Sequence, residues 1–351
     1  MRVHQIGFGV IPGDAITNHM VEINRRLRAW GFETAMYARH IAPELADIAR
    51  PDYEYVAHLR EAQHLLIYHY GLYSPSVRYF RASQGQRILV YHNITPARYY
   101  RGWSREQELL CEVGRRTLPG LSECDLALGD SEFNRRELVE SGFDPERTGV
   151  LPIFLSQGDL DRTPVNQTLL RQLRGHGGVN FLFVGRIVPS KAIEDLLRIF
   201  YVYHREINPQ SRLYLVGSRY VETYDRQLDA LVDALDLQDS VRFTGLVSLS
   251  DLRTYYQAAD LYLHASRHEG FCVPLLESMH FGIPILARKA AAIPETLGGA
   301  GVLFTHLRYA EIAEMAGLLV SDDGLRRQII RKQKERLLQL GPGQAEAALR
   351  Q

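Results

Sequence analysis

The sequence predicts an α/β protein of two domains, each built on a mostly parallel sheet with helices on both faces. The chain has 351 residues, which is enough for about two ordinary domains. Short apolar runs alternate with segments of helical periodicity, most regularly from residue 180 to residue 304. Such alternation is typical of doubly wound sheets, in which ligands bind at the carboxyl ends of the strands.

Bulk composition excludes several classes of function. The net charge is zero, so nothing in it indicates a nucleic-acid partner. The three cysteines, Cys111, Cys124 and Cys272, match no disulfide or metal-binding spacing and fit a reducing compartment. No apolar run approaches the ~20 residues of a membrane span, and the first residues are too polar for a signal peptide. We therefore expect a cytoplasmic protein; its oligomeric state does not follow from the sequence.

The first domain is expected over residues 1–157 and opens with a strand, a glycine-rich loop and a helix. The strand covers residues 2–8 and the loop contains Gly13 and Asp14. This arrangement suits phosphate groups, but the glycine spacing and the lack of an acid after the second strand disfavour a dinucleotide site. Asp14 has two interpretations, as a contact for an acceptor hydroxyl or as the cap of the helix through Thr17. The helix has one apolar face, formed by Ile16, Met20, Ile23 and Leu27.

Two further buried strands, over residues 64–70 and 87–92, each carry a histidine at the carboxyl end. These are His69 and His92, and Asn93 follows the second. A lone histidine at a strand end is more often structural, but neighbouring strand ends would bring these two together at the edge where ligands bind. We take His92 as a candidate that contacts the ligand and His69 as its support.

The segment from residue 96 to residue 105 combines three arginines with three aromatic residues, Tyr99 among them. Mixed cationic and aromatic side chains suit sugar stacking, which favours acceptor contact; a weak contact with a membrane surface is the alternative. A helix is expected over residues 105–118, a strand over 125–129 and a second helix over 132–141.

A polar linker is expected over residues 156–166, followed by the second domain over 166–324. A basic helix over about 325–351 is expected to return to the first domain, with an anionic membrane as a less favoured partner for its charged face. The strands of the second domain are expected over residues 180–185, 212–217, 241–244, 260–265, 284–287 and 301–304.

Cations follow the first strand of the second domain. The strand ends at Gly185, and Arg186 and Lys191 both follow it before the next helix, which we expect Ser190 to cap. Together the two cations can hold a diphosphate from two sides. Gly217 ends the next strand and is expected to lie against a nucleotide.

The stretch from residue 266 to residue 279 carries the most specific signal. A strand is followed by a loop containing Glu269, then by a helix that Pro274 can open and that contains Glu277. Free N–H groups of the loop and the positive helix end can hold a phosphate. Glu277 can accept hydrogen bonds from vicinal hydroxyls such as those of a ribose. The combination suits a nucleotide sugar.

This stretch resembles the E-x7-E motif of retaining GT-B glycosyltransferases, the glycosyltransferase family 4. Gly185 and Arg186 followed by Lys191 resemble the diphosphate clamp of the same family. The resemblance is strongest over residues 180–301 and implies a GT-B fold of two Rossmann-like domains facing one another across a cleft. The string that carries it reads Glu269-Gly270-Phe271-Cys272-Val273-Pro274, then Glu277, then Gly282-Ile283-Pro284. Cys272 departs from the pattern, because the family usually has glycine there.

The resemblance also implies roles for individual residues. Arg186 and Lys191 would stabilise the departing diphosphate, Glu269 would hold the sugar and Glu277 the ribose. His92 falls where the family has a histidine near the reacting carbon. The catalytic candidates are thus His92, Arg186, Lys191 and Glu269. The donor-binding candidates are Gly185, Arg186, Lys191, Gly217, Glu269, Gly270, Phe271, Cys272, Val273 and Glu277. The acceptor or cleft candidates are Gly13, Asp14, His69, Asn93 and Tyr99.

The expected reaction moves a sugar from a nucleoside-diphosphate sugar (a UDP-sugar or GDP-mannose) to an acceptor hydroxyl, with retention, in polysaccharide, glycolipid or glycoside synthesis. No resident cofactor and no metal is expected. The alternatives are an epimerase or hydrolase of the same fold and a non-catalytic subunit that binds nucleotide sugars.

Overall fold

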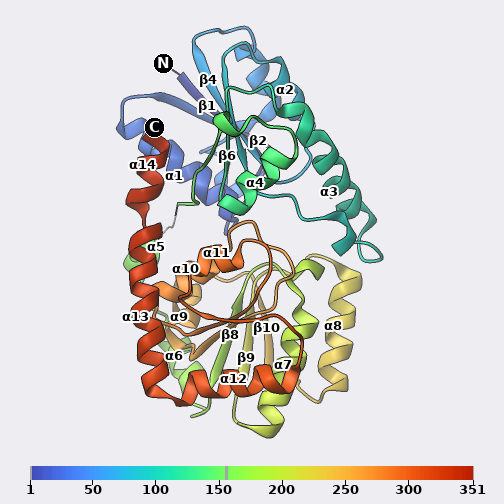
Figure 1. Cartoon of the computed structure of the whole chain (residues 1–351), viewed down its shortest axis with the longest axis vertical. Helices are drawn as coiled ribbons and strands as arrows, with labels where there is room; N and C mark the ends of the chain where they lie inside the picture. Colours follow the sequence, from blue (N-terminus) through green and yellow to red (C-terminus); the bar gives the residue numbers. More distant parts are fainter. Residues whose placement is uncertain (1, 155–156, 351) are drawn as a thin grey trace. The chain divides into compact units, whose positions relative to one another are not determined.

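The computed structural model describes residues 2–154 and 157–350, which divide into two compact units. Unit 1 contains residues 2–101, 105–154 and 340–350, and unit 2 contains residues 102–104 and 157–339 (Figure 1). The expected linker covers residues 156–166, of which Ser156 lies outside the described residues. The residues that follow it form the short helix α5 (Gln157–Arg162).

Unit 1 is built on a seven-stranded parallel sheet in the order β3-β2-β1-β4-β5-β6-β7. The strands are β1 (Arg2–Val10), β2 (Glu33–Ile41), β3 (Arg50–Pro51), β4 (His64–Tyr70), β5 (Gln86–Tyr91), β6 (Leu126–Gly129) and β7 (Thr148–Val150). The helices are α1 (Ala15–Ala29), α2 (Val77–Ala82), α3 (Arg105–Thr117), α4 (Glu132–Glu140) and α14 (Pro342–Arg350). Five 3-10 turns connect them: η1 (Pro43–Leu45), η2 (Asp52–His58), η3 (Ala97–Tyr99), η4 (Leu118–Leu121) and η5 (Pro145–Arg147).

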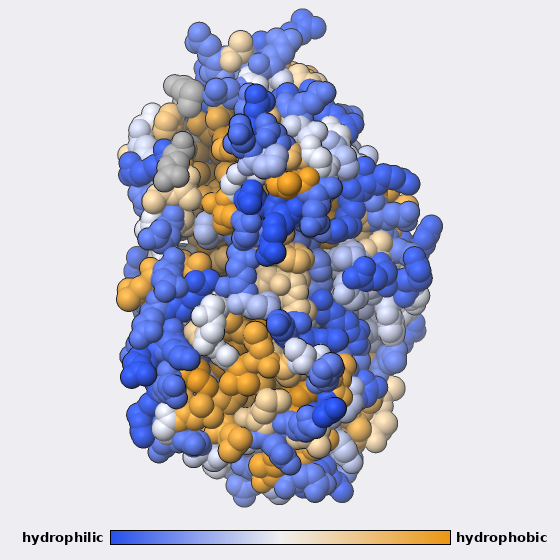
Figure 2. Space-filling view, viewed as in Figure 1, coloured by the Kyte–Doolittle hydropathy of each residue, from blue (hydrophilic) through white to orange (hydrophobic). Residues whose placement is uncertain are grey.

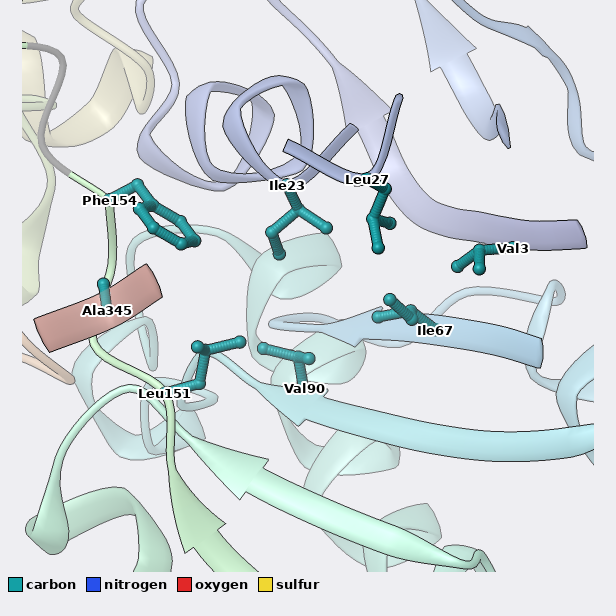
Figure 3. Packing of buried hydrophobic residues seen from close by; sticks show 8 residues of the cluster. All are labelled: Val3, Ile23, Leu27, Ile67, Val90, Leu151, Phe154 and Ala345. Carbon is teal, nitrogen blue, oxygen red and sulfur yellow. The ribbon is translucent and has the colours of Figure 1, made fainter. Parts of the chain in front are cut away.

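The core of unit 1 includes a cluster between the sheet and the apolar face of α1. Figure 3 shows its members from β1, α1, β4 and β5 pointing toward one another. The expected helical face is confirmed at Met20, Ile23 and Leu27, which are buried, whereas Ile16 is only partly so. The cluster consists of Val3, Ile23, Leu27, Ile67, Val90, Leu151, Phe154 and Ala345.

The C-terminal region forms two helices where the sequence predicted one over residues 325–351. α13 (Asp323–Leu340) packs in unit 2, where Gln333 Nε2 donates a hydrogen bond to the Ile283 carbonyl oxygen at 2.8 Å. Only residues from 340 onward belong to unit 1, where Ala345 of α14 is buried in the core. The break falls at Gly341 and Pro342, because proline has no N–H to continue the hydrogen bonds of α13.

Unit 2 contains a six-stranded parallel sheet in the order β10-β9-β8-β11-β12-β13. All six expected strands are confirmed, with ends that agree within one residue. They are β8 (Asn180–Val184), β9 (Arg212–Val216), β10 (Val241–Gly245), β11 (Leu261–His264), β12 (Ile285–Arg288) and β13 (Val302–Phe304). Besides α5, α13 and the 3-10 turn η6 (Pro189–Lys191), the unit contains α6 (Gln167–Arg174), α7 (Ile193–Glu206), α8 (Glu222–Ala234), α9 (Leu249–Ala258), α10 (Val273–His280), α11 (Ile293–Leu297) and α12 (Tyr309–Ser321).

The prediction that Ser190 caps the next helix is wrong. The chain makes the tight turn η6 first, so that Ala192, in a left-handed conformation with φ 53°, occupies the cap position of α7. Ser190 is buried, and its carbonyl oxygen accepts a hydrogen bond from the Arg267 N–H at 2.8 Å. Within residues 2–154 and 157–350, no helix is both long and apolar enough to cross a membrane.

Candidate functional site

The carboxyl edge of the unit 2 sheet gathers the expected donor-binding residues. Gly185 and Arg186 follow β8, Gly217 follows β9, and the loop with Glu269 follows β11. Because all six strands are parallel, these segments share one edge, which is where open α/β sheets bind ligands. Arg186 is exposed, whereas Lys191 is half-buried.

A buried ion pair joins two of these segments. Lys191 Nζ lies 2.6 Å from Glu269 Oε1, and His264 Nε2 lies 3.0 Å from the same oxygen. Burial alone would raise the pKa of Glu269, but the Lys191 ammonium and the His264 ring together hold it well below its usual range. Glu269 is therefore an anion, and both partners use one of its oxygens, so the other remains to accept a hydrogen bond from a ligand.

Cys272 occupies a backbone conformation that favours glycine. It has φ 75° and ψ 70° in the residue before α10, which accounts for the glycine usual in the resembling family. Its side chain is buried, with Sγ 3.5 Å from His264 Nε2. Burial raises the pKa of the thiol well above its usual value, so the group is a neutral thiol and a weak nucleophile.

Glu277 lies in α10 and is held by a tyrosine that the sequence did not indicate. Tyr256 of α9 donates a hydrogen bond to Glu277 Oε2 at 2.5 Å, and its ring stacks on Phe281 at an interplanar angle of 1°. Burial raises the pKa of Glu277. Tyr256 precedes Glu277 by 21 residues, so only the folded chain shows that it orients this carboxyl group.

Gly217 has a structural reason to be glycine. A Cβ added to it would lie 2.0 Å from the carbonyl oxygen of Gly185, so the chains leaving β8 and β9 approach too closely for a side chain. The Gly217 N–H donates to the Gly245 carbonyl oxygen at 3.0 Å. The expected contact of Gly217 with a nucleotide stays a prediction.

Arg267 also went unrecognised in the sequence, although it lies in the motif stretch. Its guanidinium lies 2.7 Å from Glu194 Oε1 and 3.0 Å from Asp195 Oδ2, in the first turn of α7. Together with its backbone bond to Ser190, this links the loop that carries Glu269 to the turn that carries Lys191.

In unit 1, four side chains form a buried hydrogen-bonded chain across adjacent strands. Asp130 Oδ2 lies 2.9 Å from His92 Nδ1, His92 Nε2 lies 2.9 Å from His69 Nδ1, and His69 Nε2 lies 2.9 Å from Gln5 Oε1. The residues come from the ends of β6 and β5 and from within β4 and β1. The expected proximity of His69 and His92 is thus present, whereas Gln5 and Asp130 were missed.

This chain has a defined proton count. The Gln5 amide nitrogen donates to the Met20 carbonyl oxygen at 3.1 Å, so Gln5 Oε1 needs an N–H from His69. Two arrangements of protons satisfy all three hydrogen bonds between these side chains. In one, Asp130 is ionised and the two imidazole rings carry three protons between them. In the other, Asp130 is protonated and both rings are neutral. Burial raises the pKa of Asp130 and lowers that of His69, which favours the neutral form. In this form every hydrogen bond is donated in the same direction, from the Asp130 hydroxyl at one end to the Met20 carbonyl oxygen at the other.

The remaining candidates in unit 1 are mostly engaged in the fold. The His92 side chain is only 1% exposed, so its ring would have to leave a partner to reach a ligand. Asn93 Nδ2 donates to Asn134 Oδ1 and Glu137 Oε2 of α4. Asp14 caps α1, since its carboxylate accepts a hydrogen bond from the Thr17 N–H at 3.0 Å.

Gly13 and Tyr99 lie in loops that follow β1 and β5. Gly13 is exposed with φ 73°, in the turn before α1. Tyr99 belongs to η3, and the Arg98 guanidinium lies 5.0 Å from its ring centroid. Both are on the carboxyl side of their strands, at the same edge as His92.

Two hollows in unit 2 lie away from these residues. One, of about 280 Å³, lies between α6, β10 and α9. The other, of about 550 Å³, is bordered by Ile207, which follows α7, and by Leu318 of α12, and Figure 2 shows apolar side chains gathered in this region. Neither hollow is lined by an expected donor residue. We therefore define the candidate site by its charged side chains.

Comparison with known proteins gives a family match that lies within unit 2. Residues 171–336 match the family described as Glycosyl transferases group 1, a segment that contains β8 to β13 and the whole of the Lys191, His264 and Glu269 cluster. Anabaena HepE in complex with UDP-glucose has a similar structure, with a TM-score of 0.79 at 17% identity over 99% of this chain and 98% of that one. WaaG, a glycosyltransferase involved in lipopolysaccharide biosynthesis, has a TM-score of 0.72 at 15% identity, over 95% of this chain and 94% of its own.

Curated relatives match over part of their length. O-antigen chain mannosyltransferase B of Escherichia coli is 29% identical over 52% of this chain and 48% of its own. D-inositol 3-phosphate glycosyltransferase of Geodermatophilus obscurus is 31% identical over 52% of this chain and 42% of its own. The chain thus spans about half or less of the length of these relatives.

The two parallel sheets with interleaved helices constitute the GT-B fold. The solved structures, at 17% and 15% identity, show the fold of this chain, and the family match covers residues 171–336 of unit 2. The similarity of this segment is to Glycosyl transferases group 1.

Proposed function

We propose that this protein is a retaining glycosyltransferase of family 4 that transfers a sugar from a UDP-sugar or GDP-mannose to an acceptor hydroxyl. The observation that carries the proposal is the Lys191–Glu269–His264 cluster at the carboxyl edge of the unit 2 sheet, within the segment that matches the family. The UDP-glucose bound by HepE and the mannosyl transfer named for the Escherichia coli relative support this class of donor.

In the proposed mechanism, Lys191 and Arg186 hold the diphosphate. Lys191 has three N–H groups and uses one on Glu269, which leaves two for phosphate oxygens. Charge accumulates on the diphosphate as the bond to the sugar breaks, so cations fixed beside it stabilise the transition state more than the ground state. The loop from Gly270 to Val273 supplies backbone N–H groups to the same anion.

The two glutamates bind different parts of the donor, the sugar and the ribose. Glu269 accepts hydrogen bonds from sugar hydroxyls through Oε2, while Lys191 and His264 keep it ionised through Oε1. Glu277, oriented by Tyr256, accepts the ribose hydroxyls. A carboxylate already paired with an ammonium is a weak nucleophile and base, which favours a front-face reaction in which the leaving phosphate takes the acceptor proton.

Unit 1 is proposed to recognise the acceptor, and His92 is proposed to act near the reacting carbon. The acceptor belongs to polysaccharide, glycolipid or glycoside synthesis, and no resident cofactor takes part. The cytoplasm is the proposed compartment, in keeping with three buried free cysteines, and contact with the inner face of a membrane is the alternative.

A screen of nucleotide sugars against hydroxyl acceptors tests the proposal. Incubation with UDP-sugars and GDP-mannose should give a glycosylated product only when an acceptor is present, and NMR of that product should show the anomeric configuration of the donor. Conversion of the donor without acceptor would instead indicate an epimerase or hydrolase. Binding without any turnover would indicate a non-catalytic subunit.

A further inference from the structure

A second cluster of ionisable side chains lies in unit 1, at the amino-terminal edge of its sheet. His4 belongs to β1, His58 ends η2, and Glu61 precedes β4 by three residues. One ligand atom from each lies within 4.8 Å of the others. The candidates for donor and acceptor binding follow the strands at their carboxyl ends, so this cluster is separate from them.

His4 lacks polar partners although it is buried. Its exposed fraction is 4%, and neither ring nitrogen has a hydrogen-bond partner within residues 2–154 and 157–350. The centroid of the His4 ring lies 5.7 Å from the ring centroids of both Tyr37 and Tyr55. It lies 4.4 Å from the ring centroid of His58. Buried polar atoms are almost always satisfied, so an orphaned imidazole that faces other ligating groups points to a missing ligand.

The other two side chains provide an anion and a route from solvent. His58 Nδ1 lies 3.0 Å from Glu61 Oε1, and their side chains are 21% and 35% exposed. Arg2 Nη1 lies 3.3 Å from both carboxylate oxygens, but its side chain is 47% exposed, so water screens its charge. His64 is committed elsewhere, with Nδ1 2.6 Å from the Glu61 carbonyl oxygen and Nε2 2.6 Å from the Tyr55 hydroxyl.

We propose that His4, His58 and Glu61 bind a zinc ion. Two imidazole nitrogens and one carboxylate oxygen are a donor set that zinc uses, with the fourth position open to water. The three ligand atoms already lie within 4.8 Å of one another, and zinc binding requires the half-buried side chains of His58 and Glu61 to turn until their ligand atoms converge with a nitrogen of His4. The bound ion joins β1, η2 and the start of β4, so its binding stabilises unit 1.

Within the described residues, one other group of three ligating side chains lies close together: His264, Glu269 and Cys272. There the Lys191 ammonium already occupies Glu269, and the buried thiol holds its proton. A cation at that position is opposed by a fixed positive charge and a protonated ligand. Zinc is therefore assigned to the unit 1 cluster.

The test uses the full chain, treated with EDTA, dialysed and titrated with zinc by calorimetry. We expect one zinc per chain, and a rise in Tm of roughly 5 °C or more at a hundredfold excess over Kd. Glu61→Gln and His58→Ala, both at half-buried positions that leave the core intact, should each weaken zinc binding roughly tenfold or more. Cobalt bound by the wild type should show the visible absorption of a tetrahedral site, and these variants should lose it.

Three further variants make the result decisive. His306→Ala removes an exposed histidine outside the cluster and should leave zinc affinity unchanged. His4→Asn at the buried position should abolish binding, with circular dichroism showing that the chain is folded. Absence of zinc binding by the wild type, or equal affinity in the wild type and Glu61→Gln, would overturn the proposal. Binding that Cys272→Ser abolishes and His58→Ala spares would place the ion in unit 2 and overturn it equally.

Discussion

Lys191 Nζ and Glu269 Oε1 lie 2.6 Å apart, which joins the proposed diphosphate cation directly to the proposed sugar-binding carboxylate. Both side chains are largely buried, at 18% and 8% exposure. Removing one partner of such a pair leaves the other charge without compensation. Loss of Lys191 therefore leaves Glu269 as a buried charge without its main partner, whereas Glu269→Gln leaves Lys191 in place for the diphosphate.

Lys191→Ala is expected to lower kcat more than it raises the donor KM. Loss of one charged donor at a transition state costs on the order of 3 kcal/mol, or roughly a hundredfold in rate. Lys191→Arg keeps the charge but replaces a compact ammonium with a planar fork, so it should recover only part of the rate. Steady-state kinetics measures both.

The matched control is the double variant Lys191→Ala/Glu269→Gln, in which the buried charge is also removed. It should recover thermal stability lost in Lys191→Ala without recovering kcat. A Lys191→Ala enzyme with normal kcat and a raised KM would show that Lys191 only tethers the ground state.

Cys272→Val is expected to destabilise the protein by about 2 kcal/mol or more, because a β-branched side chain fits poorly at φ 75°. Cys272→Gly should cost less than Cys272→Val, since glycine adopts this conformation without strain while losing only the buried thiol. Urea denaturation of the two variants checks the order. A larger loss in Cys272→Gly would mean that thiol packing outweighs backbone strain.

The hydrogen-bonded chain of Asp130, His92, His69 and Gln5 predicts that two substitutions of Asp130 differ in their effect on stability. Asp130→Asn can still donate to His92 Nδ1, which preserves the neutral chain, and should cost less than about 1 kcal/mol at pH 7. Asp130→Ala removes the donor and should cost about 1–3 kcal/mol. A severe loss in Asp130→Asn would instead indicate an ionised Asp130 beside an imidazolium.

The pH dependence follows from the raised pKa of Asp130. A carboxyl group whose pKa is higher in the folded state contributes stability below its unfolded pKa of about 3.9, and loses it as pH rises to the folded pKa. The stability of the wild type relative to Asp130→Asn should therefore fall as pH increases from about 4. A difference that rises with pH over this interval would contradict the assignment.

Much of this architecture was accessible from the sequence, because local patterns carry it. The strands of unit 2 are continuous apolar runs bounded by glycines or charged residues, and the periodic helices between them fix a parallel sheet. The positions of Lys191 and Glu269 at one edge follow from that topology. Their direct contact does not, since it depends on the turn η6 and on Arg267 linking two loops.

Other features depend on contacts that no local pattern encodes. Tyr256 meets Glu277 across two helices, and Gln5 meets His69 across two strands. Ser190 has the residue type of a helix cap, but the tertiary structure places Ala192 there. In each case a bond between distant segments decided the outcome, and propensity alone was uninformative.

Transfer is expected to continue in EDTA, because Arg186 and Lys191 supply the positive charge at the diphosphate. The zinc proposed in unit 1 affects stability, so the assay should be run well below the Tm of the EDTA-treated enzyme. Complete loss of transfer that Mg²⁺ or Mn²⁺ restores and Zn²⁺ does not would contradict this prediction.

The most direct test of the donor site is a calorimetric comparison of free nucleotide and nucleotide sugar binding to Glu277→Ala and Glu269→Gln. Glu277 is assigned to the ribose, which both ligands contain, so Glu277→Ala should weaken both. Glu269 is assigned to the sugar, so Glu269→Gln should leave the affinity for UDP or GDP intact and weaken only the sugar-bearing donor. Equal loss of free-nucleotide affinity in the two variants, or wild-type protein that binds neither ligand, would contradict the proposed site.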